Sequence, residues 1–352
     1  MCIRRKKMKW KPPANASVIK GYRLLTRHKQ ETRQRQQRTQ NVVSSSAPVA
    51  PTFTILKFGL GWDHETEGLY EDPSTLKYIH DDDDELLVAL GAGIDDDVDL
   101  RNTQFTDNQG KKVDFPDAYN QGQLGSCTAN ALAFCYQFDM LNEVISFGPG
   151  KTSIPSRLFI YYYERASENT INFDNGAKLS DGIKNVLDIK GVCSETDWPY
   201  YDKTNGNETY KIQPNSNAIE NAKNHKIISQ TDAFIALHNT VENLKNNLQR
   251  GSPIAFGFKV YQSFYNISEG NPTMPIPSPS QGDKLIGGHA VVLVGFKEKE
   301  KVFIVRNSWG KGWGDNGYFF MPYDFIEAVY TDPKDNKVKP YVSDFWSIIE
   351  VS

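Results

Sequence analysis

The chain has 352 residues, of which 39% are hydrophobic and 12% aromatic, so it can bury a core in one large domain with an extension or in two domains. Its net charge of −3 averages two regions of opposite sign, and no run of eighteen apolar residues is present that would span a membrane. Four cysteines without CxxC pairing argue against a disulfide framework or a structural zinc site. We expect no metal and no cofactor.

The N-terminal part of the chain carries blocks of like charge. Residues 1–51 are expected to form a basic, disordered extension that ends in the linker SSSAPVAP. In residues 52–98 the sign reverses, with DDDDE at Asp81–Glu85. Such blocks are usually disordered or lie on solvated faces. Two further hypotheses remain open: residues 1–40 contact nucleic acid or an acidic partner, and residues 52–98 form a propeptide-like regulatory region.

Two observations bear on where the protein works. The basic N-terminus is not followed by an apolar stretch, so no secretory signal is expected. Sparse cysteines fit a reducing compartment, in which a reactive thiol stays free. The sequence therefore predicts an intracellular-type protein, either cytoplasmic or packaged in a particle.

Globular patterning becomes continuous from about Val98, and residues 99–352 are expected to form one domain. Helical spacing predicts a first helix from Cys127 with one apolar face and Ser126 as its N-cap, and further helices in IPSRLFIYYYERA and LSDGIKNVLDIKG. After Gly251, the stretches SPIAFGFKV, GGHAVVLVGF, KVFIVRNSW and GYFFM predict antiparallel strands. Helices followed by strands are typical of an α+β fold with segregated halves.

Cys127 is the candidate nucleophile among the cysteines. It lies in the first turn of the predicted first helix, where free backbone N–H groups and the helix dipole stabilise a thiolate. Cys135 lies inside the apolar stripe of the same helix, and we interpret it as a packing residue. Cys193 is interpreted in the same way. Only Cys127 occupies a position that suits an anion.

A thiolate nucleophile also needs a histidine partner, and His289 stands at the mouth of a predicted strand. The polar turn KEKEK, centred near residue 299, brings His289 opposite Asn307 or within a residue or two of it. An asparagine oxygen can fix the orientation and tautomer of an imidazole. Trp309 is expected to shield that hydrogen bond from water. Gln121 offers a side-chain amide that can join the Cys127 backbone N–H in binding an oxyanion.

The stretches QGQLGSC, GGHAVVLVGF and VRNSWGKGWGDNGYF together resemble the papain-like cysteine peptidase family in residue type, order and spacing. The strand GSPIAFGFKVYQSF looks most like that of cathepsin B. The resemblance covers about Asp99 to the C-terminus and implies a helical half, an antiparallel sheet or barrel half, and an active-site cleft between them. It implies Cys127 as nucleophile, His289 as ion-pair partner and general acid/base, Asn307 as orienting residue and Gln121 as oxyanion donor.

The resemblance also implies positions for the substrate, with Trp309 counted among them. Asn175 and Gly176 match the family's segment whose backbone pairs with an extended substrate. Leu179, Gly257 and Gly288 fall near positions that line the S2 pocket, which receives the second residue before the scissile bond. Glycine at two of these positions leaves the pocket roomy and uncharged, so we expect it to prefer apolar or aromatic side chains.

The chain departs from the family's secreted members at two positions near the nucleophile. Leu124 stands where they have a disulfide cysteine, which points to an intracellular-type member, and Thr128 replaces a tryptophan. The sequence predicts a cysteine endopeptidase, made as a zymogen, that works through a Cys-His-Asn thioester mechanism. An exopeptidase or transpeptidase of the same fold remains an alternative. So does a binding protein whose basic N-terminal arm contacts nucleic acid.

Overall fold

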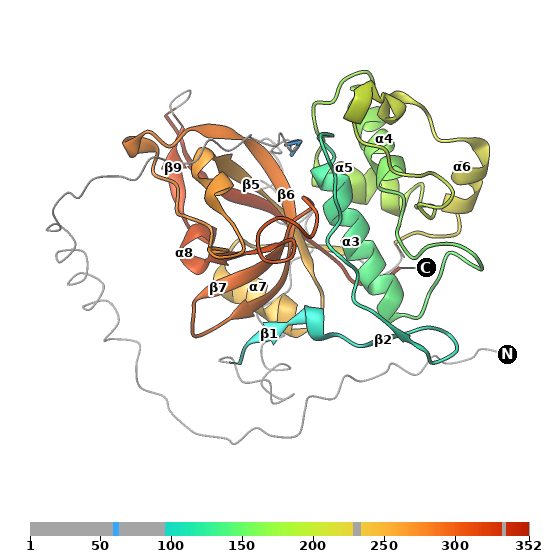
Figure 1. The fold of residues 1–352 in the computed structure, drawn as a ribbon, viewed down its shortest axis with the longest axis horizontal. Helices are drawn as coiled ribbons and strands as arrows, with labels where there is room; N and C mark the ends of the chain where they lie inside the picture. The colour runs from blue at the N-terminus through green and yellow to red at the C-terminus, as the bar shows by residue number, and fades with distance from the viewer. Residues whose placement is uncertain (1–58, 63–95, 228–233, 333–335, 352) are drawn as a thin grey trace, which may run out of the picture. The chain divides into compact units, whose positions relative to one another are not determined.

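The structure is a computed structural model that describes residues 59–62, 96–227, 234–332 and 336–351. The predicted basic extension 1–51, and residues 52–98 apart from 59–62 and 96–98, lie outside the described residues. Most helices gather in one half and the strands of the main sheet in the other, which confirms the α+β expectation (Figure 1). The helices are α3 (Cys127–Asn142), α4 (Arg157–Ser167), α5 (Leu179–Asp181) with a π-helical continuation (Gly182–Asp188), α6 (Ser216–Ala222), α7 (Val241–Gln249) and α8 (Tyr323–Ile326).

The main sheet is antiparallel, and its strands follow the order β4-β11-β5-β6-β7-β8; β1 lies off this path and pairs with the C-terminal end of β6. The four predicted strands are confirmed as β5 to β8, and α7 packs against β5 and β6. The short hairpins β2–β3 and β9–β10 stand apart from this sheet. The strands are β1 (Val98–Asp99), β2 (Phe105–Thr106), β3 (Lys112–Val113), β4 (Phe234–Leu237), β5 (Ile254–Tyr261), β6 (Leu285–Lys297), β7 (Val302–Arg306), β8 (Tyr318–Pro322), β9 (Val329–Thr331), β10 (Val338–Pro340) and β11 (Val342–Ile348).

Helix α3 begins at Cys127, as the sequence predicts, but it is not a one-faced amphipathic helix. All its residues from Cys127 to Leu141 are buried, because α4 packs against it from the helical half and β5 and β6 from the sheet half. Ser126 is the N-cap residue, as predicted, but its hydroxyl accepts no hydrogen bond from the backbone of the first turn. Instead it accepts from the Asn130 side-chain amide at 3.1 Å and lies 2.6 Å from the Tyr200 hydroxyl. The first backbone N–H groups of α3 thus keep their capacity for an anion.

The β6–β7 hairpin sets the spacing between two candidate residues. The register pairs Lys297 with Val302 and shifts at a bulge between Leu293 and Gly295. Beyond the bulge Val292 pairs with Arg306, and continuing that register places the next residue, Asn307, opposite residue 291. Asn307 therefore lies two positions along the hairpin from residue 289, within the predicted range.

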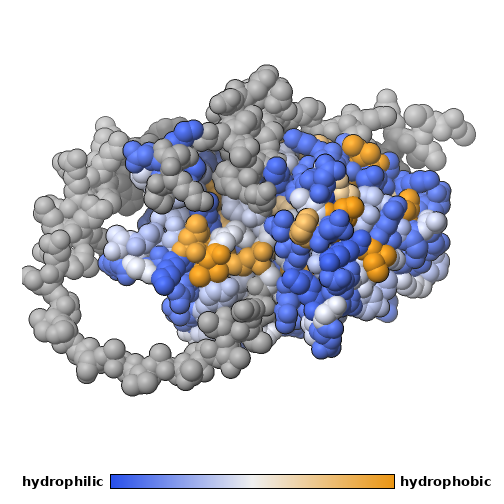
Figure 2. Space-filling view, turned by 90° about the horizontal axis from the view of Figure 1, so that it is seen from above, coloured by the Kyte–Doolittle hydropathy of each residue, from blue (hydrophilic) through white to orange (hydrophobic). Residues whose placement is uncertain are grey.

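The exposed apolar side chains of the described residues are dispersed over several elements. Figure 2 shows one face that is mostly hydrophilic, with separate hydrophobic clusters. Among the described segments, no helix combines the length and apolarity that crossing a bilayer requires. The large hydrophobic side chains that reach the surface include Phe173, Ile189, Ile212, Ile276, Leu285, Ile286, Val329 and Val338.

Candidate active site

Cys127 is fully buried at the first position of α3. Burial raises the pKa of its thiol to about 12, although backbone hydrogen bonds from Ala290 and Gly61 act in the opposite direction. The thiol is therefore protonated at neutral pH in this structure. Ala290 follows His289 on β6, so the same strand that carries the imidazole also reaches the cysteine sulfur.

His289 and Asn307 meet as the hairpin register requires. The Nε2 atom of His289 lies 2.7 Å from Oδ1 of Asn307, and both side chains are buried. The Trp309 ring lies over the imidazole, with 4.9 Å between ring centroids. Burial lowers the pKa of His289 to about 4, while the bond to Asn307 opposes the shift. The imidazole is neutral at pH 7, and Nε2 donates to the asparagine oxygen in the tautomer that this contact favours.

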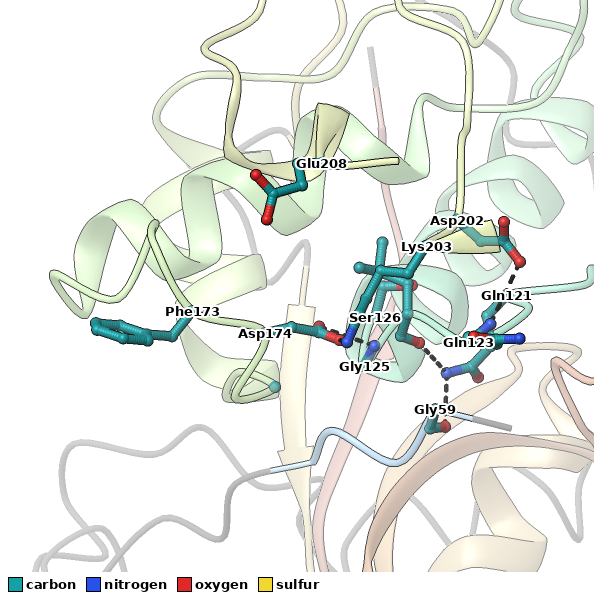
Figure 3. Close-up of polar contacts among 12 residues, drawn as sticks. Gly59, Gln121, Gln123, Gly125, Ser126, Phe173, Asp174, Asp202, Lys203 and Glu208 are labelled. Carbon is teal, nitrogen blue, oxygen red and sulfur yellow. Dashed lines mark hydrogen bonds and ion pairs between the residues drawn. The ribbon is translucent and has the colours of Figure 1, made fainter. Parts of the chain in front are cut away.

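Gln121 is fully buried in the loop before α3. Its Nε2 donates to the carbonyl oxygens of Gly59, at 2.9 Å, and Leu124, at 2.8 Å. Its Oε1 accepts a hydrogen bond from the Ser308 hydroxyl at 2.5 Å, which fixes the direction of the amide. Figure 3 shows the Gln121 amide directed at the Gly59 carbonyl. The side-chain donor predicted for an oxyanion thus holds a backbone carbonyl of the chain itself.

That carbonyl belongs to residues 59–62, which we call the cleft segment. Trp62 forms a parallel bridge with Ala177, whose N–H donates to the Gly61 carbonyl at 2.7 Å. On the sheet side the Trp62 N–H donates to the Gly288 carbonyl at 3.3 Å. Gly176 has a φ of +84°, and a Cβ there would lie 1.8 Å from the Gly61 oxygen. The cleft segment therefore lies between the two halves, along the backbone that the resemblance assigns to substrate.

The Trp62 side chain fills the position predicted for the S2 pocket. It is 6% exposed, and Cβ atoms built on Gly257 and Gly288 would come within 1.9 and 2.7 Å of its ring. Its Nε1 donates to Oδ2 of Asp344 at 3.0 Å. The sequence predicts an uncharged pocket here, and the buried Asp344 carboxyl group lies beside the ring that fills this position. Asp344 is not among the site residues that the sequence predicts.

A β-bulge aims Asp344 at this pocket. The pairing of β11 with β5 shifts between Ser343 and Trp346, with Ser343 opposite Gly257. Asp344 has a φ of +59°, a left-handed conformation that Asp adopts more readily than most residues. Bulges re-aim side chains near active sites. The only signal in the sequence is an acidic residue inside the apolar strand YVSDFW.

The other predicted positions lie around this arrangement. Leu179 is fully buried at the first position of α5, and Asn175 lies in the loop that leads to it. Thr128 donates from its hydroxyl to the buried Glu164 carboxyl group at 2.9 Å, and burial raises the Glu164 pKa well above its usual value. Cys135 and Cys193 are buried and form no disulfide. In the described part of the chain no group of His, Cys, Asp and Glu side chains is arranged to hold a metal ion.

A cysteine at a helix N-terminus, an imidazole held by an asparagine and an inward-facing glutamine amide lie between a helical and a sheet half. Together they define a thiol-dependent hydrolase with a papain-like fold. The contacts unite residues that are far apart in the sequence, from Gly59 to Asp344. Comparison with known proteins identifies the class more closely.

The chain belongs to the papain family of cysteine proteases, whose family model matches residues 168–329. An uncharacterized peptidase C1-like protein of Acanthamoeba polyphaga mimivirus is 40% identical over 249 residues, which cover 69% of this chain and 73% of that protein. The crystal structure of xylellain, a cysteine protease from Xylella fastidiosa, superposes with a TM-score of 0.64 at 34% identity and covers 83% of this chain and 96% of its own. Mouse pro-cathepsin H is 26% identical over 209 residues, 57% of this chain and 55% of its own. The protein is therefore a protease that acts on protein or peptide substrates.

Proposed function

We propose that the protein is a cysteine endopeptidase in which Cys127, His289 and Asn307 act together through a thioester. The contact of 2.7 Å between His289 and Asn307 carries this proposal, because it leaves the other ring nitrogen, Nδ1, to exchange a proton with Cys127. Nδ1 has no hydrogen-bond partner among the described residues. The adjacent Ala290 backbone, at the cysteine sulfur, supports the same arrangement.

In the proposed reaction His289 Nδ1 takes the thiol proton of Cys127, and the thiolate attacks the carbonyl carbon of the scissile bond. Gln121 Nε2 and the Cys127 backbone N–H bind the oxyanion. His289 then gives the proton to the leaving amine, and the C–N bond breaks to leave a thioester. Water, deprotonated by His289, attacks the thioester, and the peptide acid leaves as the thiol reforms.

The pKa values of the covered site disfavour the first step. A thiol with a pKa of about 12 and an imidazole with a pKa of about 4 remain neutral, and burial is the main cause of both shifts. We infer that the cleft segment inhibits the enzyme, as expected of a propeptide-like region within residues 52–98. Displacing it lets water reach both groups, so the pKa of the thiol falls and that of the imidazole rises.

The direction of the cleft segment supports this inhibitory role. Residue numbers fall from Trp62 in the pocket through Gly61 at the cysteine sulfur to Gly59 at Gln121. A substrate with its second residue before the scissile bond in the same pocket has residue numbers that rise toward the cysteine. The cleft segment therefore occupies the site with reversed polarity, and it is held without presenting a bond for cleavage.

The endopeptidase assignment is tested with an internally quenched peptide and mass spectrometry of the products. We expect cleavage at internal bonds, with new fragments on both sides of each cut. Removal of only one or two terminal residues would favour an exopeptidase. Transfer of the acyl group to an added amine in preference to water would favour a transpeptidase.

In the Trp62→Asp chain, in which the cleft segment is displaced, Gln121→Ala is expected to lower kcat by about 10²-fold, because one oxyanion donor is lost. Steady-state hydrolysis of a fluorogenic peptide measures the effect. Gln123→Ala is the matched control, since this exposed glutamine is two residues away and contacts Asp202 through its backbone N–H. Equal rates for the two variants would exclude the Gln121 side chain from the oxyanion site.

Asp344→Ala is expected to change which side chains the S2 pocket accepts. The proposed pocket favours a large side chain with an N–H donor, such as Trp, or a cation over Phe, because Asp344 accepts from Trp62 Nε1. Loss of a hydrogen bond to a charged group costs about 1.5 kcal/mol or more, which corresponds to about tenfold. The ratio of kcat/KM for peptides with Trp and Phe at this position should fall by that factor. An unchanged ratio would remove Asp344 from substrate selection.

A further inference from the structure

Polar side chains from three other segments hold the loop that carries Gln121 and ends before Cys127. We call residues 121–126 the oxyanion loop. Asp174 is central to its support: its Oδ1 accepts from the Gly125 N–H at 2.9 Å and from the Tyr161 hydroxyl at 2.6 Å. Its Oδ2 pairs with Lys203 Nζ at 3.0 Å. Figure 3 shows the Asp174 carboxylate between Lys203 and the Gly125 backbone.

The Asp174 carboxylate links the two backbone segments that border the cleft segment. These are the oxyanion loop and the backbone at Gly176 and Ala177, which we call the Gly176 strip. The Gly176 N–H donates to the Tyr161 hydroxyl at 3.3 Å, and that hydroxyl donates to Asp174. A Cβ on Gly125 would lie 3.0 Å from Asp174 Oδ1 and 3.5 Å from the Gly176 nitrogen. The Asp174 side chain is only 9% exposed, so these hydrogen bonds are shielded from water. Its position therefore fixes the distance between the oxyanion loop and the Gly176 strip.

Further hydrogen bonds hold the segment that precedes Asp174 and the part of the oxyanion loop near Lys203. Arg165 of α4 is buried and donates to the carbonyl oxygens of Ile171, at 2.7 Å, and Phe173, at 3.2 Å. These hydrogen bonds attach the segment before Asp174 to α4. Next to Lys203, the Asp202 carboxylate accepts from the Gln123 N–H at 3.3 Å. Two backbone N–H groups of the oxyanion loop, those of Gln123 and Gly125, thus donate to carboxylates.

We propose that Asp174 is a positioning residue for the protease reaction. Its charge-assisted hydrogen bonds restrain the oxyanion loop at Gly125. In the family's secreted members, a disulfide at the position of the preceding residue, Leu124, restrains the same loop. An oxyanion donor acts fully only when it is about 2.7–3.1 Å from the developing charge, so a small shift of the oxyanion loop lowers the rate. The kinetic part of this inference rests on the proposed endopeptidase function.

The test compares Asp174→Ala, Asp174→Asn and Lys203→Gln in the full chain. Each is combined with Trp62→Asp, so that release of the cleft segment does not itself alter the rates. Asp107→Ala is the matched control, because that carboxylate likewise accepts from the backbone, from the N–H groups of Gln109 and Lys111 in the exposed turn between β2 and β3. Peptide hydrolysis, the rate of Cys127 alkylation by iodoacetamide, and amide hydrogen exchange of residues 121–127 are measured.

We expect Asp174→Ala to lower kcat by about 30-fold or more, with KM and the alkylation rate within about threefold, because alkylation forms no oxyanion. Exchange in residues 121–127 should quicken by about tenfold or more, as local opening becomes easier. Asn at position 174 keeps the acceptor for Gly125 but loses the ion pair, so Asp174→Asn should lie between Asp174→Ala and the parent. Lys203→Gln should change kcat by threefold or less, since Lys203 is 40% exposed.

Two results would overturn the proposal. One is an unchanged kcat with unchanged exchange in Asp174→Ala. The other is a parallel fall of kcat and alkylation in Asp174→Asn, which shows general damage to the nucleophile instead of a displaced oxyanion loop. If the parent chain with Trp62→Asp hydrolyses no peptide, the proposed function fails, while the exchange experiment still decides whether Asp174 holds the loop.

Discussion

Cys127→Ala is expected to abolish peptide hydrolysis, leaving a rate lower by about 10⁴-fold or more, because the residue supplies both the bond to the acyl group and the proton that reaches the leaving amine. Loss of Gln121 weakens one contact with the transition state, whereas loss of the sulfur removes the covalent pathway itself. The variant keeps its fold, since the change deletes one buried sulfur atom at the first position of α3.

Cys135→Ala and Cys193→Ala are the matched controls for the nucleophile. Both cysteines are buried and free, and Cys135 lies in the same helix as Cys127. With Trp62→Asp present in every chain, so that the cleft segment is displaced, an irreversible epoxysuccinyl-type inhibitor should label the parent protein and both controls once, and should not label Cys127→Ala. Mass spectrometry of the intact protein reads this out directly. Labelling that persists without Cys127, in folded protein, would assign the nucleophile to another residue.

The placement of the candidate catalytic residues could be predicted because short local patterns determine it. The helical spacing after Cys127 and the polar turn between two apolar strands each determine a geometry over fewer than twenty residues. The hairpin then brings His289 and Asn307 together. Even the bulge near Gly295, which the pattern does not reveal, moves the register by a single residue.

Features that depend on distant segments were not predictable. The burial of α3 on all sides follows from packing between two halves, and its composition alone does not distinguish this from one buried face. Asp344 reaches the pocket through a bulge in β11. The cleft segment has one recognisable feature in the sequence, the two glycines of GLGW. Cβ atoms on Gly59 and Gly61 would lie 2.1 and 1.8 Å from the carbonyl oxygens of Leu124 and Gly125, so only glycine permits this approach.

Trp62→Asp is expected to raise the peptidase activity of the full chain by about 10³-fold, up to the limit set by a fully open site. The substitution deletes a buried aromatic ring and places a carboxylate in a closed pocket that already contains Asp344. Burying an unpaired charge costs about 4 kcal/mol or more, and each 1.4 kcal/mol lost from the closed state raises the open population about tenfold.

Smaller changes at the same position give a graded series. Trp62→Ala loses the ring at a cost of about 3 kcal/mol, so activity should rise about 10²-fold. Trp62→Phe keeps most of the packing but loses the hydrogen bond from Nε1 to Asp344, and a rise of about tenfold is expected. Ile212→Ala, which removes an exposed apolar side chain in the helical half, serves as the control and should leave activity unchanged.

The rate of Cys127 alkylation by iodoacetamide separates relief of inhibition from a change in the chemistry. In the covered site the thiol pKa of about 12 keeps the reactive thiolate scarce at pH 7, and its fraction grows only as the pH rises toward that value. Displacement of the cleft segment lowers this pKa, so alkylation of the Trp62→Asp protein at pH 7 should accelerate together with hydrolysis. A folded Trp62→Asp protein that is no faster than the wild type in either assay would show that the cleft segment is not the inhibitor. A rise in both rates ties the inhibition to the same burial that holds Cys127 and His289 in their neutral forms.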